Sequence, residues 1–230
     1  MLGIIGAMDE EVAKLKECMD NVEVSNRASM DFYKGSLMGK DVVVVRSGIG
    51  KVNAGICTQI LVDLYNVDGV INTGIAGSLN ADIDIGDIVL ATDALQHDVD
   101  ATGFGYELGV IPRMDKSVFA ADERLREIAK AACLKVNPDI NVFEGRVVSG
   151  DQFISDKDKK SYILDNFKGY CTEMEGAAIA QAAYLNNIPF LIIRAISDKA
   201  DDSATVDYPT FEAKAIEHSV RLVKELISNY

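Results

Sequence analysis

The sequence predicts an α/β fold with a largely parallel sheet that helices cover on both faces. Short apolar segments rich in β-branched residues alternate with amphipathic segments along all 230 residues, which is the order that βαβ units produce. Four of the expected strands end in glycine-rich or acidic sequences, near Gly6, Gly74, Ser149 and Asp198. Because ligands bind at the carboxyl ends of strands in such sheets, we expect these four ends to surround a site.

In the first half of the chain, turn and cap residues mark the boundaries of the elements. Asp9 is a suitable N-cap for the first helix, with Glu10 and Glu11 in its first turn. Acids there usually complement the helix dipole, although the glycines that precede them would also let one acid face a ligand. Residues 38–40 predict a hairpin turn. The expected strands are residues 2–6, 32–37, 41–46, 68–73 and 87–92, and the expected helices end near residues 19 and 65.

The second half starts with a long loop and ends with a long helix. Loops as long as residues 97–113 are often functional or interfacial in compact domains. Ile216, Val220, Val223 and Ile227 have the spacing of one helix face. The expected helices are residues 122–135, 156–166, 177–185 and 209–227, and the expected strands are residues 142–148 and 189–198.

The last of these strands ends in charged residues. Residues 190–193 are apolar and too few for a helix, which predicts a strand buried on both faces. Side chains alternate along a strand, so Arg194, Ile196 and Asp198 would share one face. An arginine and an aspartate would therefore meet at the end of the strand, either as a structural ion pair or as part of a site.

Composition is that of a globular chain, expected to form a single domain over residues 1–230 with 48% hydrophobic and 26% charged residues. The net charge of −13 argues against nucleic acid or an anionic membrane surface as partner. No apolar run has the length of a membrane span, and the first residues suit a strand better than a signal peptide. The four cysteines form no CxxC pair, so reduced thiols of a cytoplasmic protein are expected, and two histidines argue against a His/Cys zinc site.

Six segments, taken together, carry a specific resemblance. They occur in the following order across essentially the whole chain: Gly3–Glu11, Ser47–Val52, Ile71–Gly77, Ser149–Ile154, Thr172–Glu175 and Arg194–Asp198. One such match would be weak, but six in order resemble the nucleoside phosphorylase/nucleosidase superfamily, and most closely its bacterial 5'-methylthioadenosine/S-adenosylhomocysteine nucleosidases. The resemblance implies a three-layer α/β/α sandwich around a mixed, twisted sheet. It further implies hydrolysis of the N-glycosidic bond of an adenine nucleoside, without metal or organic cofactor, by a homodimer.

The resemblance also implies roles for five polar residues. Asp198 resembles the general acid that protonates adenine N7, with Ser197 holding its carboxylate. Glu11 resembles the base that activates the attacking water, with Arg194 nearby. Glu175 would accept hydrogen bonds from the ribose hydroxyls.

Further positions are implied as substrate-binding. Phe153 would stack on adenine while the backbone of Ile154 reads its Watson–Crick edge, and Phe104 would reach into the neighbouring subunit's site. Taken alone, Phe153 and Met174 would more often be core residues. The remaining implied substrate-binding residues are Met8, Ile49, Ala76, Gly77, Thr172, Met174 and Tyr208.

The proposed acid must be protonated to work. An aspartate has a pKa of about 3.9, so mostly protonated Asp198 at pH 7 needs an upward shift of about three units. Burial favours this shift, whereas a nearby Arg194 opposes it. We therefore expect Asp198 to acquire its proton when the base is bound, and not to store it permanently in the free protein.

Three departures from the family pattern bear on the water site and the substituent preference: Ile75, Tyr208 and Ala101 stand where serine, phenylalanine and valine are common. His97-Asp98 has the form of a catalytic dyad, but no nucleophile accompanies it and a structural role is favoured.

Two other functions stay open. A nucleoside phosphorylase would need a cationic cradle for phosphate, which Glu10 and Glu11 would oppose, and a nucleoside-binding sensor would not need both acids.

Overall fold

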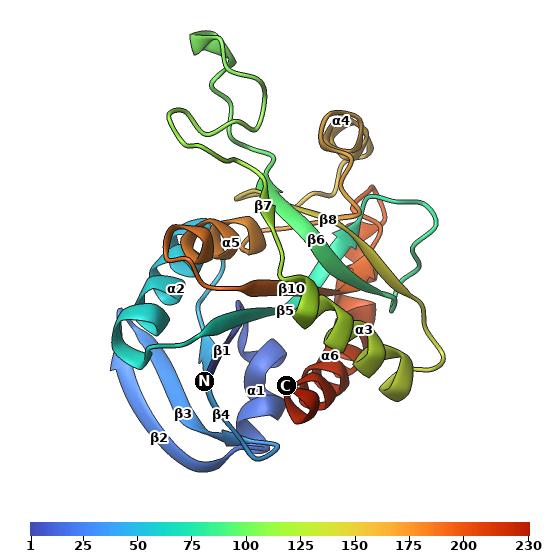
Figure 1. Ribbon diagram of the computed structural model, residues 1–230. Coiled ribbons are helices and arrows are strands. Elements are labelled where there is room, and N and C mark those ends of the chain that lie inside the picture. Colours follow the sequence, from blue (N-terminus) through green and yellow to red (C-terminus); the bar gives the residue numbers. More distant parts are fainter.

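The computed structural model describes residues 1–230, with one mixed sheet of ten strands flanked by six helices (Figure 1). The strands are β1 (Leu2–Gly6), β2 (Asp20–Arg27), β3 (Met30–Leu37), β4 (Lys40–Arg46), β5 (Gly69–Ser78), β6 (Ile88–Gln96), β7 (Phe119–Ala120), β8 (Val142–Ser149), β9 (Cys171–Glu173) and β10 (Phe190–Asp198). The helices are α1 (Asp9–Glu17), α2 (Lys51–Tyr65), α3 (Glu123–Val136), α4 (Lys157–Phe167), α5 (Gly176–Leu185) and α6 (Ala204–Asn229).

The sheet is parallel at its centre and closes on itself at one side. β4, β1, β5 and β10 are parallel neighbours. β6 joins β10 antiparallel, β8 and β9 continue parallel to β6, and β9 returns antiparallel to β5. The expected alternation of strands and helices is therefore confirmed, but the sheet is mixed, as the family resemblance implied, and not largely parallel.

Helices cover both faces of the sheet, as expected. α2 packs against α5 on one face, while α6 contacts α1 and α3 on the other (Figure 1). The apolar residues at helical spacing in α6, Ile216, Val220, Val223 and Ile227, are buried in the core on that side. None of the six helices combines the length and apolar character that crossing a bilayer requires.

Several boundaries differ from the sequence-based expectation. β2 was not predicted, because only one of its eight residues is even partly buried and its sequence is mostly polar. β5 and β6 extend to Ser78 and Gln96, since their last residues pair with β9 and β8. Asp9 is the first residue of α1 and not its N-cap, which is Met8.

The last helix begins five residues before the proline that was expected to start it. Pro209 lies inside α6. The turn before it is closed by the N–H groups of Val206 and Asp207, which donate to the carbonyl of Ser203 at 2.9 and 3.0 Å. Proline is favoured at a helix start but does not require one there. This earlier start places Tyr208 on a helix, next to the carboxyl ends of β1 and β10.

Candidate active site

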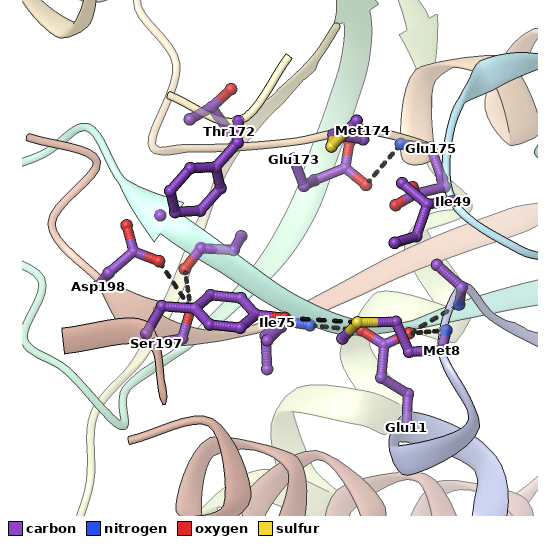
Figure 2. Close-up of a pocket in the computed structure, with 15 residues that line it drawn as sticks. Met8, Glu11, Ile49, Ile75, Thr172, Glu173, Met174, Glu175, Ser197 and Asp198 are labelled. Atoms are coloured by element: carbon purple, nitrogen blue, oxygen red, sulfur yellow. Dashed lines mark hydrogen bonds between the residues drawn. The ribbon is translucent and has the colours of Figure 1, made fainter. Parts of the chain in front are cut away.

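One cavity of about 390 Å³ lies where the expected strand ends converge. Figure 2 shows Asp198 and Ser197 at one end of the cavity and Met8, Glu11, Ile49 and Glu175 toward the other. Glu11 and Asp198, which are 187 positions apart in the sequence, thus open onto the same space. The lining residues are Ala7, Met8, Glu11, Ile49, Ile75, Ala76, Gly77, Phe153, Thr172, Glu173, Met174, Glu175, Ser197, Asp198 and Tyr208.

Glu11 is fixed by three backbone N–H donors. Its Oε2 accepts from Ala7 and Met8 at 2.7 and 3.0 Å, and its Oε1 accepts from Ile75 at 3.1 Å. Burial raises the pKa of the carboxyl, and the nearby guanidinium of Arg194 and the three N–H donors oppose that rise. The carboxylate therefore caps the start of α1 and also faces the cavity, so both readings of the acids after β1 hold for this residue.

Gly74 on β5 has no space for a larger residue. A Cβ atom at this position would collide with the guanidinium of Arg194 and the carboxylate of Glu11. The glycine that ends the apolar part of β5 therefore lets these two charged groups approach each other across the strand.

Arg194 does not meet Asp198, contrary to expectation. Its guanidinium donates to Glu173 and Asn72 and lies 3.9 Å from Glu175. Arg194 is buried and does not line the cavity. The register between β10 and β5 shifts after Ile196, so that the alternation of side chains is broken before Asp198. The prediction that both charges share one strand face was wrong for this reason.

Asp198 is held by its own neighbours. Its Oδ2 accepts from the Ser197 hydroxyl and its Oδ1 from the Ala200 N–H, both at 2.8 Å, so the predicted contact with Ser197 is present. Burial raises the pKa of Asp198, and these two hydrogen bonds oppose the rise while Asp207 and Asp201 add to it. Arg194, which was expected to oppose the rise, is bound to Glu173 and Asn72 instead.

Two glutamates share the space beside Arg194. Glu175 accepts from the Gly50 N–H at 2.8 Å, and burial together with the charge of Glu173 raises its pKa to about 8. Glu173 accepts from Arg194, Ser149 and the Gly176 N–H. Glu173 was not among the predicted site residues, although its place in Thr172–Glu175 could have indicated it.

Replacing Glu175 with glutamine is expected to stabilise the fold at neutral pH. A folded-state pKa of about 8 against 4.5 for the free side chain means that the unfolded chain releases this proton first. The stability of the native protein therefore falls as pH rises from about 4.5 toward 8, by on the order of 3 kcal/mol at pH 7. Urea unfolding at pH 4.5 and pH 7 should show a difference between variant and wild type that grows with pH.

The matched control for this prediction is Glu127→Gln, which changes an exposed glutamate on α3. This control should leave the free energy of unfolding unchanged at both pH values. A difference for Glu175→Gln that is the same at pH 4.5 and pH 7 would contradict the raised pKa.

Most of the predicted substrate-binding residues lie together in the cavity. Phe153 is half exposed, and its ring meets that of Tyr208 edge-on at 5.8 Å, so it is not a core residue. Ile154 is buried and does not line the cavity, which leaves only its backbone for the role expected of it. Those that line the cavity are Met8, Ile49, Ala76, Gly77, Phe153, Thr172, Met174, Glu175 and Tyr208.

Phe104 lies outside the cavity of its own chain. It belongs to a short 3₁₀ helix (Thr102–Phe104) on the loop between β6 and β7, which projects from the body of the molecule (Figure 1), and it is 87% exposed.

His97 is buried away from the cavity against Gly150, and Asp98 pairs with Lys51 at 2.6 Å. These contacts fit the structural role favoured for the His97-Asp98 pair. No group of three or more His, Cys, Asp or Glu side chains is arranged to hold a metal ion.

Comparison with known proteins adds the family. Residues 1–228 match the phosphorylase superfamily. The chain is 45% identical to a 5'-methylthioadenosine/S-adenosylhomocysteine nucleosidase of Staphylococcus saprophyticus, over 99% of each chain. The nucleosidase of Neisseria meningitidis, solved with methylthio-immucillin-A, superposes with a TM-score of 0.95 at 39% identity, covering 100% of this chain and 99% of the other. A futalosine hydrolase of Helicobacter pylori superposes with a TM-score of 0.94 at 33% identity, covering 100% and 97%.

Proposed function

The chain belongs to the phosphorylase superfamily, and from this premise we propose that it is a nucleosidase that hydrolyses the N-glycosidic bond of 5'-methylthioadenosine and S-adenosylhomocysteine. Its relatives with that name match over almost their whole length. The products would be adenine and the 5'-thio-substituted ribose. We include 5'-deoxyadenosine among the proposed substrates, because it presents the same base and sugar.

The observation that carries this proposal is the single cavity shared by Glu11 and Asp198. Breaking a C–N bond at an anomeric carbon builds positive charge on the sugar and negative charge on the base. Asp198 would donate a proton to adenine N7 and so neutralise the leaving group, while Glu11 would orient and deprotonate a water molecule. Their places at opposite ends of the cavity suit one nucleoside lying between them (Figure 2).

The remaining lining residues fit the other parts of a nucleoside. Glu175 would accept hydrogen bonds from the ribose hydroxyls. Arg194 would act indirectly, because its positive charge lies beside the carboxylates of Glu173 and Glu175. Phe153 would stack on the base, next to the acid. Because burial raises the pKa of Asp198, taking up a proton from solvent when the nucleoside binds is less costly there than at an exposed carboxyl.

A phosphorylase is disfavoured by the charge of the cavity. Its lining holds four carboxyl groups, of Glu11, Glu173, Glu175 and Asp198, and no lysine or arginine. The one nearby cation, Arg194, is bound to Glu173 and Asn72. Phosphate would enter this space without the cationic donors that anion sites use.

We also propose a cytoplasmic homodimer. All four cysteines are free thiols, which suits a reducing compartment. Val52 and Ile56 of α2 are 71% and 44% exposed on one helix face, adjoining the cavity residue Ile49. Exposed apolar residues of this kind indicate a protein contact. Pairing of two chains here would also give the exposed ring of Phe104 a place against the neighbouring chain.

A substrate panel tests the reaction. Adenine release should be rapid from 5'-methylthioadenosine and S-adenosylhomocysteine in phosphate-free buffer, and added phosphate should not accelerate it. Dependence on phosphate would make the protein a phosphorylase. Tight binding of the nucleoside without any release of adenine would indicate a sensor.

A further inference from the structure

The hydroxyl group of Tyr208 links the cavity to a carboxylate outside it. Tyr208 lines the cavity, and its hydroxyl lies 3.4 Å from the Sδ of Met8, another lining residue. The same hydroxyl donates to Oε1 of Glu212 at 3.0 Å, one turn further along α6. Glu212 does not line the cavity itself, but this hydrogen bond holds its carboxylate behind the Met8 end.

The carboxylate of Glu212 has no cation of its own. Its side chain is partly exposed and forms no salt bridge, and the Tyr208 hydroxyl is its only hydrogen-bond partner. Besides burial, the groups that raise the pKa of Tyr208 are all acids, with Glu212 followed by Glu11 and Glu10. The charged groups that act most strongly on this hydroxyl are therefore negative, so a cation brought here would be favoured.

The inference rests on the proposed function, because the orientation of the nucleoside in the cavity decides which of its groups comes near Glu212. With the base at Asp198 and the water at Glu11, the 5' carbon of the ribose would point toward Met8 and Ile49, which lie away from Asp198 (Figure 2). Tyr208 also lines the cavity, and its hydroxyl contacts Met8. A methylthio group would end against the Met8 side chain. A longer substituent on sulfur would continue past Met8 toward the Tyr208 hydroxyl and Glu212.

We propose that Glu212, positioned by the Tyr208 hydroxyl, is a specificity-determining residue that binds the ammonium group of a 5'-aminoalkylthio substituent. S-adenosylhomocysteine carries such an ammonium three carbons from its sulfur, whereas methylthioadenosine carries none. The carboxylate of the homocysteine tail is not attracted by this end and would point to solvent. The protein would accordingly favour cationic over neutral 5'-substituents of equal length.

The experiment compares two nucleosides that differ only in this charge. They are 5'-(3-aminopropylthio)-5'-deoxyadenosine, which is cationic, and 5'-butylthio-5'-deoxyadenosine, which is its neutral counterpart. The measured quantity is the ratio of their kcat/KM values for adenine release. In Glu212→Gln, which keeps the shape and the acceptor oxygen, this ratio should fall about fivefold, as expected for the loss of an ion pair at a partly exposed site.

The matched control is Glu217→Gln on the same helix, which removes the same charge from another partly exposed glutamate, one that is paired with Arg221. It should keep the wild-type ratio. An unchanged ratio in Glu212→Gln, or an equal fall in the control, would overturn the inference while leaving the proposed function intact. If wild-type protein releases adenine from neither nucleoside nor from 5'-methylthioadenosine, the proposed function fails and this inference with it. Because a ratio is measured within each variant, partial loss of folded protein does not affect it.

Discussion

Replacing Asp198 with asparagine is expected to lower kcat for adenine release by about 10²- to 10⁴-fold, which is the usual contribution of a general acid. Asparagine has the same shape, and its amide can still accept from the Ala200 N–H and bond to the Ser197 hydroxyl. It lacks the proton that adenine N7 would receive. Because burial raises the pKa of Asp198, a neutral residue there removes a cost of ionisation, and the variant should be at least as stable as wild type at pH 7.

A second nucleoside separates acid catalysis from a structural effect. In a 5'-methylthio nucleoside with a less basic purine, the purine leaves more easily without protonation. Asp198→Asn should therefore slow the hydrolysis of this nucleoside much less. The control is Asp202→Asn, which makes the same change at an exposed residue outside the cavity. Equal losses for both leaving groups would mean that Asp198 is not the proton donor.

Replacing Glu11 with glutamine is expected to lower kcat by a similar factor of about 10² to 10⁴, because a neutral amide does not accept a proton from water. Unlike Asp198→Asn, this variant should lose stability. The two oxygens of Glu11 accept three N–H donors, from Ala7, Met8 and Ile75. Whichever way the amide of glutamine turns, its NH₂ group faces at least one of them, which costs about 1–3 kcal/mol.

Adenine binding distinguishes lost chemistry from a lost site. Calorimetry should show that Glu11→Gln binds adenine within about threefold of wild type, since the base would lie at the Asp198 end of the cavity. Glu17→Gln, at the exposed end of the same helix, should match wild type in kcat and in adenine binding. Activity near the wild-type value in folded Glu11→Gln would remove this residue from the mechanism.

Three acids of the cavity share one physical property. Burial raises the pKa of Asp198, Glu175 and Glu11. Burying several acids in one site lowers the stability of the fold at neutral pH. It serves the reaction, because a carboxyl that resists ionisation can retain or receive a proton near neutral pH. Stability gained by neutral substitution at Asp198 or Glu175 should therefore come with loss of activity, whereas at Glu11 the lost N–H contacts outweigh that gain.

Much of the fold followed from local patterns. Apolar runs of strand length and residues at helical spacing located all six helices and most strands within a few residues, since these patterns depend on neighbours in the sequence. β2 was not predicted because seven of its eight residues are exposed, so its sequence has no sustained alternation of apolar and polar residues. The start of α6 was misplaced because proline allows a helix start but does not impose one.

The candidate site was predicted in its membership more than in its connections. The glycine-rich and acidic strand ends contain Glu11, Asp198 and Glu175, and all three line one cavity. Arg194 was expected beside Asp198, but in the structure it forms an ion pair with Glu173. A register shift of one residue between β10 and β5 decides this, and it leaves no mark on the sequence of β10.

The sequence by itself determined which residue types stand at each strand end, because the strand period, the glycines and the acids are all local properties. Only the tertiary structure decided which of these side chains touch, how deeply each carboxyl is buried and which acid receives the single buried arginine. Those outcomes depend on strand register and on packing between segments up to about two hundred positions apart. Desolvation and pairing of charge, which set the pKa of every acid in the cavity, arise only when those segments have come together.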